Sequence, residues 1–147
     1  KPRIRTRKNN RGLVLRSRRK KVFNYVKELM KSNILNENKE NIASFISGFC
    51  DAEADVGMTT NRTYKGKKYH QPRIQITQKD KEALLVIKSM LEKEFEIKSN
   101  MHKKWNQNCW ILKVAGNKRV NLFRKEIDFK NPTKHKKLLS VHSSLNC

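Results

Sequence analysis

The sequence predicts an α+β domain built on a four-stranded antiparallel sheet. Two blocks, residues 56–76 and 98–115, each combine two short strand patterns with a turn between them, which is typical of β-hairpins. Apolar residues at helical spacing precede the first block, separate the two blocks and follow the second. The resulting order is helix, hairpin, helix, hairpin, helix, helix. This order is typical of proteins in which helices pack against an antiparallel sheet.

The composition favours a polyanionic partner. The 147 residues suit one compact domain, and 35 Lys and Arg against 13 Asp and Glu give a net charge of +22. Such an excess of positive charge favours binding to nucleic acid or to an anionic membrane surface. No apolar run is long enough for a transmembrane helix. The three cysteines, Cys50, Cys109 and Cys147, are far apart, which argues against a disulfide scaffold or a zinc ribbon.

The first 21 residues differ from the rest of the chain. Residues 1–21 hold eleven Lys and Arg and no acid, and they predict a basic, flexible and mostly disordered arm. A simple solubility tail is the alternative. We expect a single domain over 22–147, which begins with a helix over 18–31 because Val and Leu recur there at helical spacing. In the Asn-rich stretch that follows, Asn36 or Asn38 is the expected N-cap of the next helix.

The block 42–52 predicts a helix with two packing faces. Its apolar face consists of Ile42, Phe45, Ile46, Phe49 and Cys50. On the opposite side, Ser44, Gly48 and Ala52 recur at every fourth position, so that face is small rather than charged. Small residues at this spacing let two helix backbones approach closely. We therefore expect this helix to pack on both sides, with one partner a helix of its own kind.

The same helix is expected to end near Ala52. One more turn would aim Glu53 into the middle of the apolar face, so Glu53 should lie at the C-terminal tip. Asp51, Glu53 and Asp55 form the one acidic cluster of this basic chain. Acids at a helix C-terminus oppose the helix dipole. A divalent cation would compensate for them, and Mg²⁺ binds few carboxylates together with phosphate oxygens and water.

The remaining elements follow in order. Val56 and Met58 alternate with small polar residues and predict a strand, followed by a turn at 62–68 and a second strand over 69–76. We expect a helix from the N-cap Asp80 to Phe95, strands over 98–104 and 109–115 with a turn between them, and helices over 117–126 and from Pro132 or Thr133 to about Ser143.

Alternate positions of both hairpins form a polar face without acids. The expected members of this face belong to residue types that recognise base edges in a major groove or lie beside them. They are Thr59, Asn61, Thr63, Tyr69, Gln71, Arg73, Gln75, Asn100, His102 and Lys104. Nearby lysines are expected to bind phosphates: Lys65, Lys67, Lys68 and Lys103. A solvated sheet face is the alternative. The pattern predicts a DNA-binding surface.

One segment resembles a known family signature. Ile46-Ser47-Gly48-Phe49-Cys50-Asp51-Ala52-Glu53-Ala54 is similar to the motif of the LAGLIDADG homing endonucleases. The second strand, Ile74-Gln75-Ile76-Thr77-Gln78, and the order of elements fit the same family. The resemblance covers residues 42–143 and the motif occurs once. It implies a saddle-shaped sheet with helices on one face, and single-motif members are homodimers with the motif helix at the interface.

The resemblance also implies roles for individual residues. The catalytic acid and Mg²⁺ ligand would be Glu53, assisted by the backbone carbonyl of Ala52 and by Glu53 of the second subunit. Gln78 would organise a water, and Lys134, or Lys136, would be the basic catalytic residue. Ser44, Gly48 and Ala52 would form the dimer contact. The motif usually ends in Gly, whereas this chain has Ala54.

Together these features predict a site-specific, Mg²⁺-dependent, homodimeric endonuclease for double-stranded DNA. The resemblance implies a long pseudo-palindromic target, short 3′ overhangs, association with an intron or intein, and an intracellular location, in the cytoplasm or in an organelle. Two alternatives use the same scaffold: an RNA-binding intron maturase, and a DNA-binding protein without catalysis. The intact Glu53 and Gln78 disfavour the non-catalytic alternative.

Overall fold

The computed structural model describes residues 3–7, 10–16, 38–64 and 66–143, and within them the side chains of 38–59, 66 and 70–141. The chain divides into two units, Lys1–Asn36 and Glu37–Cys147, which are considered separately. In the first unit, strands β1 (Arg3–Arg7) and β2 (Asn10–Arg16) pair antiparallel, with Arg3 opposite Arg16.

This hairpin was not predicted from the sequence, which favoured an unpaired arm. Strand β2 contains the run Leu13-Val14-Leu15, and apolar and β-branched residues of this kind favour strands despite the surrounding charge. The predicted domain boundary at residue 22 and the helix predicted over 18–31 lie outside the described residues.

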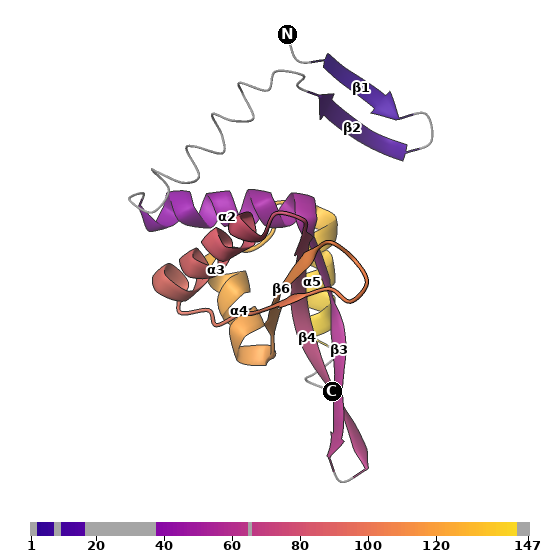
Figure 1. Ribbon diagram of the computed structural model, residues 1–147, viewed down its shortest axis with the longest axis vertical. Coiled ribbons are helices and arrows are strands. Elements are labelled where there is room, and N and C mark those ends of the chain that lie inside the picture. Colours follow the sequence, from indigo (N-terminus) through magenta and orange to yellow (C-terminus); the bar gives the residue numbers. More distant parts are fainter. Residues whose placement is uncertain (1–2, 8–9, 17–37, 65, 144–147) are drawn as a thin grey trace. The chain divides into compact units, whose positions relative to one another are not determined.

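The second unit contains a four-stranded antiparallel sheet. Its strands lie in the order β3-β4-β6-β5. Their bounds are Ala54–Tyr64 for β3, Lys67–Gln78 for β4, Asn100–Lys103 for β5 and Trp110–Ala115 for β6. Strands β3 and β4 are much longer than the other two and extend as a two-stranded ribbon beyond the helices of this unit (Figure 1).

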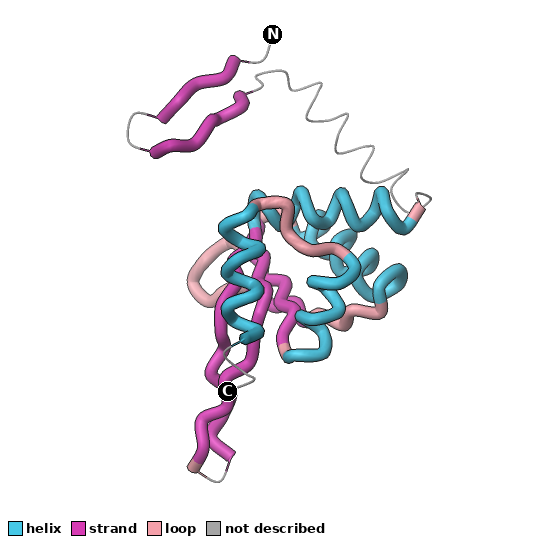
Figure 2. Tube along the Cα trace, turned by 180° about the vertical axis from the view of Figure 1, so that it is seen from behind, coloured by secondary structure: helices cyan, strands magenta, loops and turns pink. Residues whose placement is uncertain are grey.

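Within the described residues, four helices accompany the sheet: α2 (Lys39–Glu53), α3 (Lys81–Phe95), α4 (Asn117–Glu126) and α5 (Pro132–Ser143). Helices α2, α3 and α4 contact the central strands, and α5 lies along β3, as the ribbon and the tube show (Figures 1 and 2). The predicted α+β fold class is confirmed. None of the described helices is long and apolar enough to cross a membrane.

Local signals fix where these helices begin and end. The side chain of Asn38 caps α2 by accepting from the Asn41 backbone N–H at 2.9 Å, and Asp80 caps α3 by accepting from Glu82 at 3.0 Å. Gly116, with φ 98°, makes the sharp turn between β6 and α4. The boundaries predicted from the sequence for α3, α4 and α5 are therefore confirmed.

The core lies between the sheet and the helices. It consists mainly of Val56, Ile74, Ile76, Leu112 and Val114 from the strands and Ile42, Ile46, Leu84, Ile87, Leu91, Val120, Phe123 and Leu138 from the helices. The buried residues of β4 are the even-numbered ones, and the same holds for the buried side chains of β3. Because side chains alternate along a strand, the odd-numbered positions of β3 and β4 lie on the opposite, open face.

Three buried polar atoms have no hydrogen-bond partner among the described residues, and one of them is the hydroxyl of Ser47. The hydroxyl of Ser47, on the buried face of α2, is 1% exposed as a residue and makes no hydrogen bond with any described residue. An unsatisfied buried hydroxyl destabilises a fold by about 1–3 kcal/mol. We expect Ser47→Ala to increase the free energy of unfolding by about 1 kcal/mol, measured by urea denaturation. Ser140→Ala, at an exposed hydroxyl that donates to the Lys137 carbonyl at 2.8 Å, is the control and should not stabilise. A destabilised Ser47→Ala protein would show that the hydroxyl is satisfied.

Candidate active site and nucleic-acid interface

Helix α2 presents an open stripe of small residues. Ser44, Gly48 and Ala52 are all exposed, and a Cβ added at Gly48 would meet no atom within 4 Å. Phe45 and Phe49, which the sequence placed on the buried face, are only half-buried and lie along the edge of this stripe with their ring centroids 6.4 Å apart. The stripe can therefore accept a second helix at close range, with aromatic side chains beside it.

The C-terminal end of α2 lies at one end of the sheet. The helix ends at Glu53, one residue later than predicted, and Ala54 begins β3 directly. Ala54 pairs with Ile76, so Gln78, the last residue of β4, lies at the same end of the sheet as Glu53. The Glu53 side chain is exposed, and no hydrogen bond or ion pair links its carboxylate to another residue in the described part of the chain.

The acidic cluster of the sequence does not form one site. The Asp51 carboxylate accepts the Asn131 backbone N–H with both oxygens at 3.1 Å, and the Asp55 carboxylate contacts Lys137 at 3.0 Å and Arg73 at 3.7 Å. Two of the three acids are thus compensated by the protein itself, which corrects the expectation that a metal compensates for all of them. Among the described residues, no group of three or more His, Cys, Asp and Glu side chains could hold a metal ion.

One carboxylate per chain nevertheless suits a cation that two chains share. Mg²⁺ in nuclease-type sites is held by one or two carboxylates, with phosphate oxygens and water completing its shell. The last carbonyl groups of a helix have no intrahelical partner, and that of Ala52 is among them. The Glu53 carboxylate and the Ala52 carbonyl would therefore supply one half of such a site, which a second copy of the same helix end would complete.

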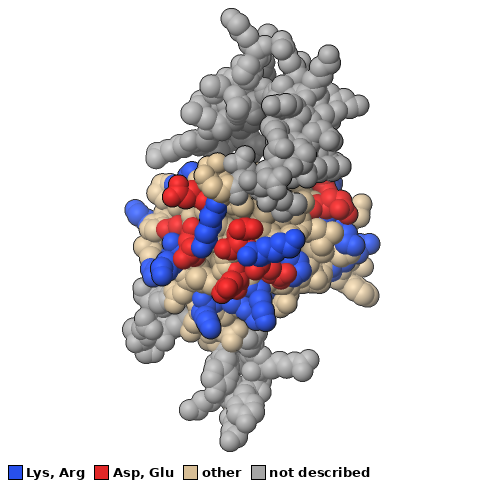
Figure 3. Space-filling model, turned by 90° about the vertical axis from the view of Figure 1, so that its left-hand side faces the viewer, with Lys and Arg blue, Asp and Glu red and all other residues tan. Residues whose placement is uncertain are grey.

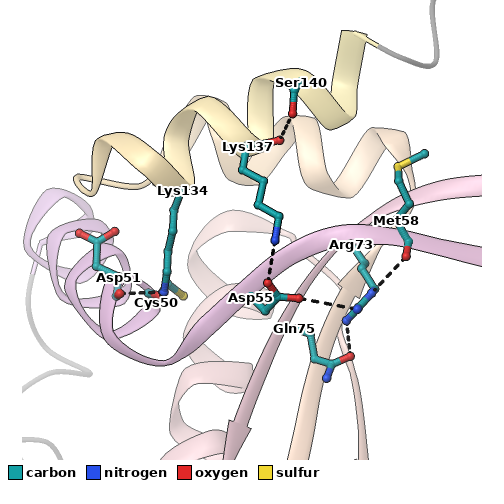
Figure 4. A network of polar contacts seen from close by, with 9 residues as sticks. All are labelled: Cys50, Asp51, Asp55, Met58, Arg73, Gln75, Lys134, Lys137 and Ser140. Atoms are coloured by element: carbon teal, nitrogen blue, oxygen red, sulfur yellow. Dashed lines mark hydrogen bonds and ion pairs between the residues drawn. The ribbon is translucent and has the colours of Figure 1, made fainter. Parts of the chain in front are cut away.

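Lys134 binds the C-terminal end of α2. Its Nζ donates to the carbonyl oxygens of Cys50 at 3.1 Å and Asp51 at 2.7 Å (Figure 4). A cation at this position balances the negative end of the helix dipole. Lys136 is exposed and makes no hydrogen bond or ion pair in the described part of the chain. Of the two lysines that the sequence left open, only Lys134 reaches the motif helix.

The neighbouring thiol is chemically inactive. Cys50 is buried, and burial raises the pKa of its thiol to about 12, although the positive charge of Lys134 lowers it in part. The thiol therefore stays protonated at neutral pH, and only the thiolate is a competent nucleophile. Burial and protonation together disfavour a role for Cys50 as a nucleophile.

The contact of Lys134 with the helix end can be tested by stability. Lys134→Met keeps the length of the side chain and removes the charged donor from two carbonyls. Hydrogen bonds to charged groups contribute about 1.5–3 kcal/mol. We therefore expect the free energy of unfolding, measured by urea denaturation, to fall by about that amount. Lys136→Met is the matched control and should change stability by less than about 0.5 kcal/mol. Equal losses in the two variants would show that Lys134 does not hold the helix end.

The open face of the sheet carries the predicted polar residues. Thr59, Gln71, Arg73 and Gln75 occupy odd-numbered positions of β3 and β4 and are half-exposed. Asn100, His102, Lys103 and Lys104 are exposed in and after β5. The side chains of the other predicted members are not described: Asn61, Thr63, Lys65, Lys67, Lys68 and Tyr69. Contact of these residues with DNA stays a prediction.

Two residues of this face were missed by the sequence analysis. Asp55 lies on it, because β3 places Asp55 directly opposite Gln75, and this contradicts the expected absence of acids. Lys113 also lies on it, opposite Gln75 in β6, and its Nζ donates to the Thr59 hydroxyl at 3.4 Å. Both could have been found from the parity of their strands, in which they alternate with the buried neighbours Val56, Leu112 and Val114.

The turn between β5 and β6 exposes a tryptophan. Trp105 is 87% exposed, follows Lys103 and Lys104, and precedes Asn106, which adopts a left-handed conformation with φ 55°. An exposed ring beside two cations is suited to contact with bases or sugars. By contrast, the side of the domain shown in Figure 3 mixes acidic and basic side chains and has no uniformly basic area.

Comparisons with known proteins identify the same fold. A family model described as LAGLIDADG-like domain matches residues 40–128. A search of curated proteins finds no match. The solved structure of the homing endonuclease I-CvuI in complex with the I-CreI target is similar with a TM-score of 0.59 and 15% identity, over 74% of this chain and 68% of that chain.

Two further solved structures resemble the chain to a similar degree. The group I intron-encoded homing endonuclease I-CeuI bound to DNA gives a TM-score of 0.56 and 15% identity, over 86% of this chain and 70% of that chain. Mesophilic variants of the homing endonuclease I-DmoI give 0.56 and 22%, over 86% of this chain and 63% of that chain. At such identities these likenesses establish the fold.

Proposed function

The chain belongs to the family of LAGLIDADG-like domains, and on that premise we propose that it is a homodimeric, Mg²⁺-dependent homing endonuclease that cleaves double-stranded DNA at a specific site. The target would be long and pseudo-palindromic, because each of two identical sheets would contact one half of it. Association with an intron or intein and action inside the cell complete the proposal.

The observation that carries the proposal is the place of one unpaired carboxylate, that of Glu53. Several exposed acids lack a cationic partner in the described part of the chain, among them Glu40, Glu82 and Glu94, but Glu53 is the one at the C-terminal end of the motif helix. Its neighbours Asp51 and Asp55 are both paired. A carboxylate left free at the end of the motif helix would repel a DNA phosphate unless a divalent cation lay between them, which is the arrangement of a metal-dependent nuclease.

The residues of each chain would have separate roles. Glu53 and the Ala52 carbonyl would hold the divalent cation, which when bound supplies an activated water and charge stabilisation at the leaving oxygen. Gln78, at the same end of the sheet, would orient the attacking water through its amide. Lys134 already donates to two carbonyls at the end of α2 and would keep that end in place against the charge of the phosphate.

A second copy of the chain would complete the centre. The open stripe of Ser44, Gly48 and Ala52 supports packing of two α2 helices about a two-fold axis, which would bring both Glu53 carboxylates to that axis. The polar open faces of the two sheets would then lie along the two half-sites, with Thr59, Gln71, Arg73, Gln75 and Lys113 toward the major groove.

The direct test uses a plasmid that carries the uninterrupted insertion site of the chain's own gene. We expect linearisation in Mg²⁺ and none in EDTA, and no cleavage of the same plasmid once the intervening sequence fills the site. Tight binding of the intron RNA, together with no cleavage of the insertion site, would replace this proposal with the maturase alternative. Binding of the DNA site without cleavage in any divalent cation would leave the non-catalytic alternative.

A further inference from the structure

Asp55 is an acidic residue on the open face of the sheet. Asp55 is 59% exposed, two residues beyond Glu53, on a surface that the proposed function turns toward phosphate groups. Its carboxylate contacts two cations from different elements, Lys137 of α5 at 3.0 Å and Arg73 of β4 at 3.7 Å (Figure 4). An acid that would otherwise repel DNA is thus neutralised inside a network of fixed geometry.

Arg73 is held across strand β3 by this network. Gly57 lies opposite Arg73 in the sheet, and a Cβ at Gly57 would stand 3.7 Å from Nη2 and 3.9 Å from Nε of Arg73. These are ordinary van der Waals distances, so the guanidinium lies directly over this position of the strand. There Nε donates to the Met58 carbonyl at 3.4 Å while Nη2 faces Asp55. The Arg73 side chain is only 23% exposed.

The guanidinium in turn fixes the orientation of Gln75. Nη1 of Arg73 donates to Oε1 of Gln75, which lies on the same strand and the same face two residues later. A guanidinium carries donors only, so the atom of the Gln75 amide that faces it must be the carbonyl oxygen. The amide nitrogen of Gln75, with its two N–H donors, therefore points away from Arg73.

An amide held in this way is less suited to the contact for which glutamine is best known. A free glutamine binds adenine through two bonds, accepting from N6 and donating to N7, and so needs its oxygen. In Gln75 that oxygen already accepts from Arg73, and an adenine amino group that used its second lone pair would meet the N–H donors of the guanidinium beside it. The other groups of the pair that can face a base are the N–H groups of Gln75 and the second N–H of Arg73 Nη1, all donors. Guanine offers two adjacent acceptors in the major groove, N7 and O6, whereas adenine and cytosine each present an amino donor there.

We propose that Asp55, Arg73 and Gln75 form one recognition unit that selects guanine at a fixed position of each DNA half-site, with Asp55 as the residue that positions Arg73. This inference rests on the proposed binding of double-stranded DNA. It assigns a specificity role to Asp55, which itself touches no base, and a base preference to Gln75 opposite to that of an unconstrained glutamine.

The test is selection of binding sites from a pool of random DNA duplexes, with the full chain in EDTA so that cleavage plays no part. Gln75→Ala identifies the position that Gln75 contacts, because discrimination is lost there alone. At that position we expect wild-type protein to prefer guanine over adenine by about tenfold or more, within the range of a bidentate base contact. Gln75→Glu, which presents oxygen acceptors instead of donors, should remove the guanine preference.

Asp55→Asn tests the positioning role. Without the carboxylate charge, Arg73 is released from its place beside Gln75, and Oε1 of Gln75 becomes free to accept from a base. We therefore expect the frequency of adenine at the mapped position of the selected sites to rise by about tenfold relative to that of guanine. Glu126→Gln is the matched control, because it removes an equal charge from another ion pair, that of Glu126 on α4 with Lys39 on α2. It should leave the base preference unchanged. Thermal melting of Asp55→Asn should show a folded protein, since the side chain is exposed.

The possible outcomes distinguish failure of the recognition unit from failure of the proposed function. A selected half-site with adenine, or with no preference, at the mapped position would overturn the inference and leave DNA recognition intact. So would an Asp55→Asn protein that keeps the wild-type preference. A pool from which wild-type protein enriches no sequence at all would overturn both the recognition unit and the proposed function.

Discussion

Glu53→Gln should abolish DNA cleavage while leaving DNA binding intact. The change keeps the size of the side chain and removes the one carboxylate at the end of α2 that no described residue neutralises. Both subunits of the proposed dimer lose it at once. Loss of a single electrostatic stabiliser slows an enzyme by about 10²–10³, so we expect cleavage to fall by about a thousandfold or more at any Mg²⁺ concentration.

Binding should respond in the opposite direction. In EDTA, a carboxylate that faces phosphate is repulsive, so the Glu53→Gln protein should bind its site as tightly as wild type or more tightly, measured by gel shift. Glu40→Gln, an exposed acid in the first turn of the same helix, is the matched control and should cut normally. A Glu53→Gln protein that cuts at a rate near that of wild type would remove the catalytic assignment.

Asp51→Asn separates chemistry from architecture at the same helix end. Its carboxylate accepts the Asn131 backbone N–H and is thereby directed toward α5. We therefore expect a loss of stability with cleavage retained at temperatures where the protein stays folded. This contrast with Glu53→Gln would show that the two acids, two residues apart, have different tasks.

Gly48→Leu should convert the protein to a monomer without cleavage activity. Within one chain the new side chain meets nothing, since a Cβ at this position has no neighbour within 4 Å, and replacing a helical Gly even removes a penalty of about 1 kcal/mol. Across a two-fold axis, however, two leucines would meet where two backbones are expected to touch, and overpacking of this kind costs about 1–3 kcal/mol or more.

We therefore expect the Gly48→Leu protein to be a folded monomer. Circular dichroism should show the helical content of wild type, sedimentation should show monomers, and plasmid cleavage should be lost. Lys93→Leu, at an exposed position of α3, is the control for added surface hydrophobicity and should remain dimeric and active. A dimeric, active Gly48→Leu protein would contradict pairing of the α2 helices.

Much of the fold could be predicted because its signals are local. The caps at Asn38 and Asp80, the turn at Gly116 and the apolar spacing of each helix act within a few residues, and these elements were placed within one to three residues of their observed bounds. The position of Glu53 at the helix end also followed from local geometry, since continuing the helix would have buried its charge.

The contacts around Glu53 could not be predicted in the same way. The partners of Asp51 and Asp55, Asn131 and Lys137, lie on a segment some 80 residues later, and nothing local indicates which acid they neutralise. The pairing of Gln75 with Asp55 and Lys113 depends on the register between strands, which a single strand pattern does not contain. Sequence analysis therefore treated three acids as one cluster and overlooked the acid on the open face.

The bonds between α5 and the end of α2 have a consequence for protein synthesis. A ribosome makes Glu53 some 80 residues before the Asn131 backbone and Lys134 that secure the helix on which it stands. A chain still being translated, or one released early by a premature stop codon, carries the acid without the groups that fix its helix. If the chain has the proposed activity, cutting should thus appear only after α5 has been synthesised and has folded back, so that unfinished copies would leave the DNA of the cell intact.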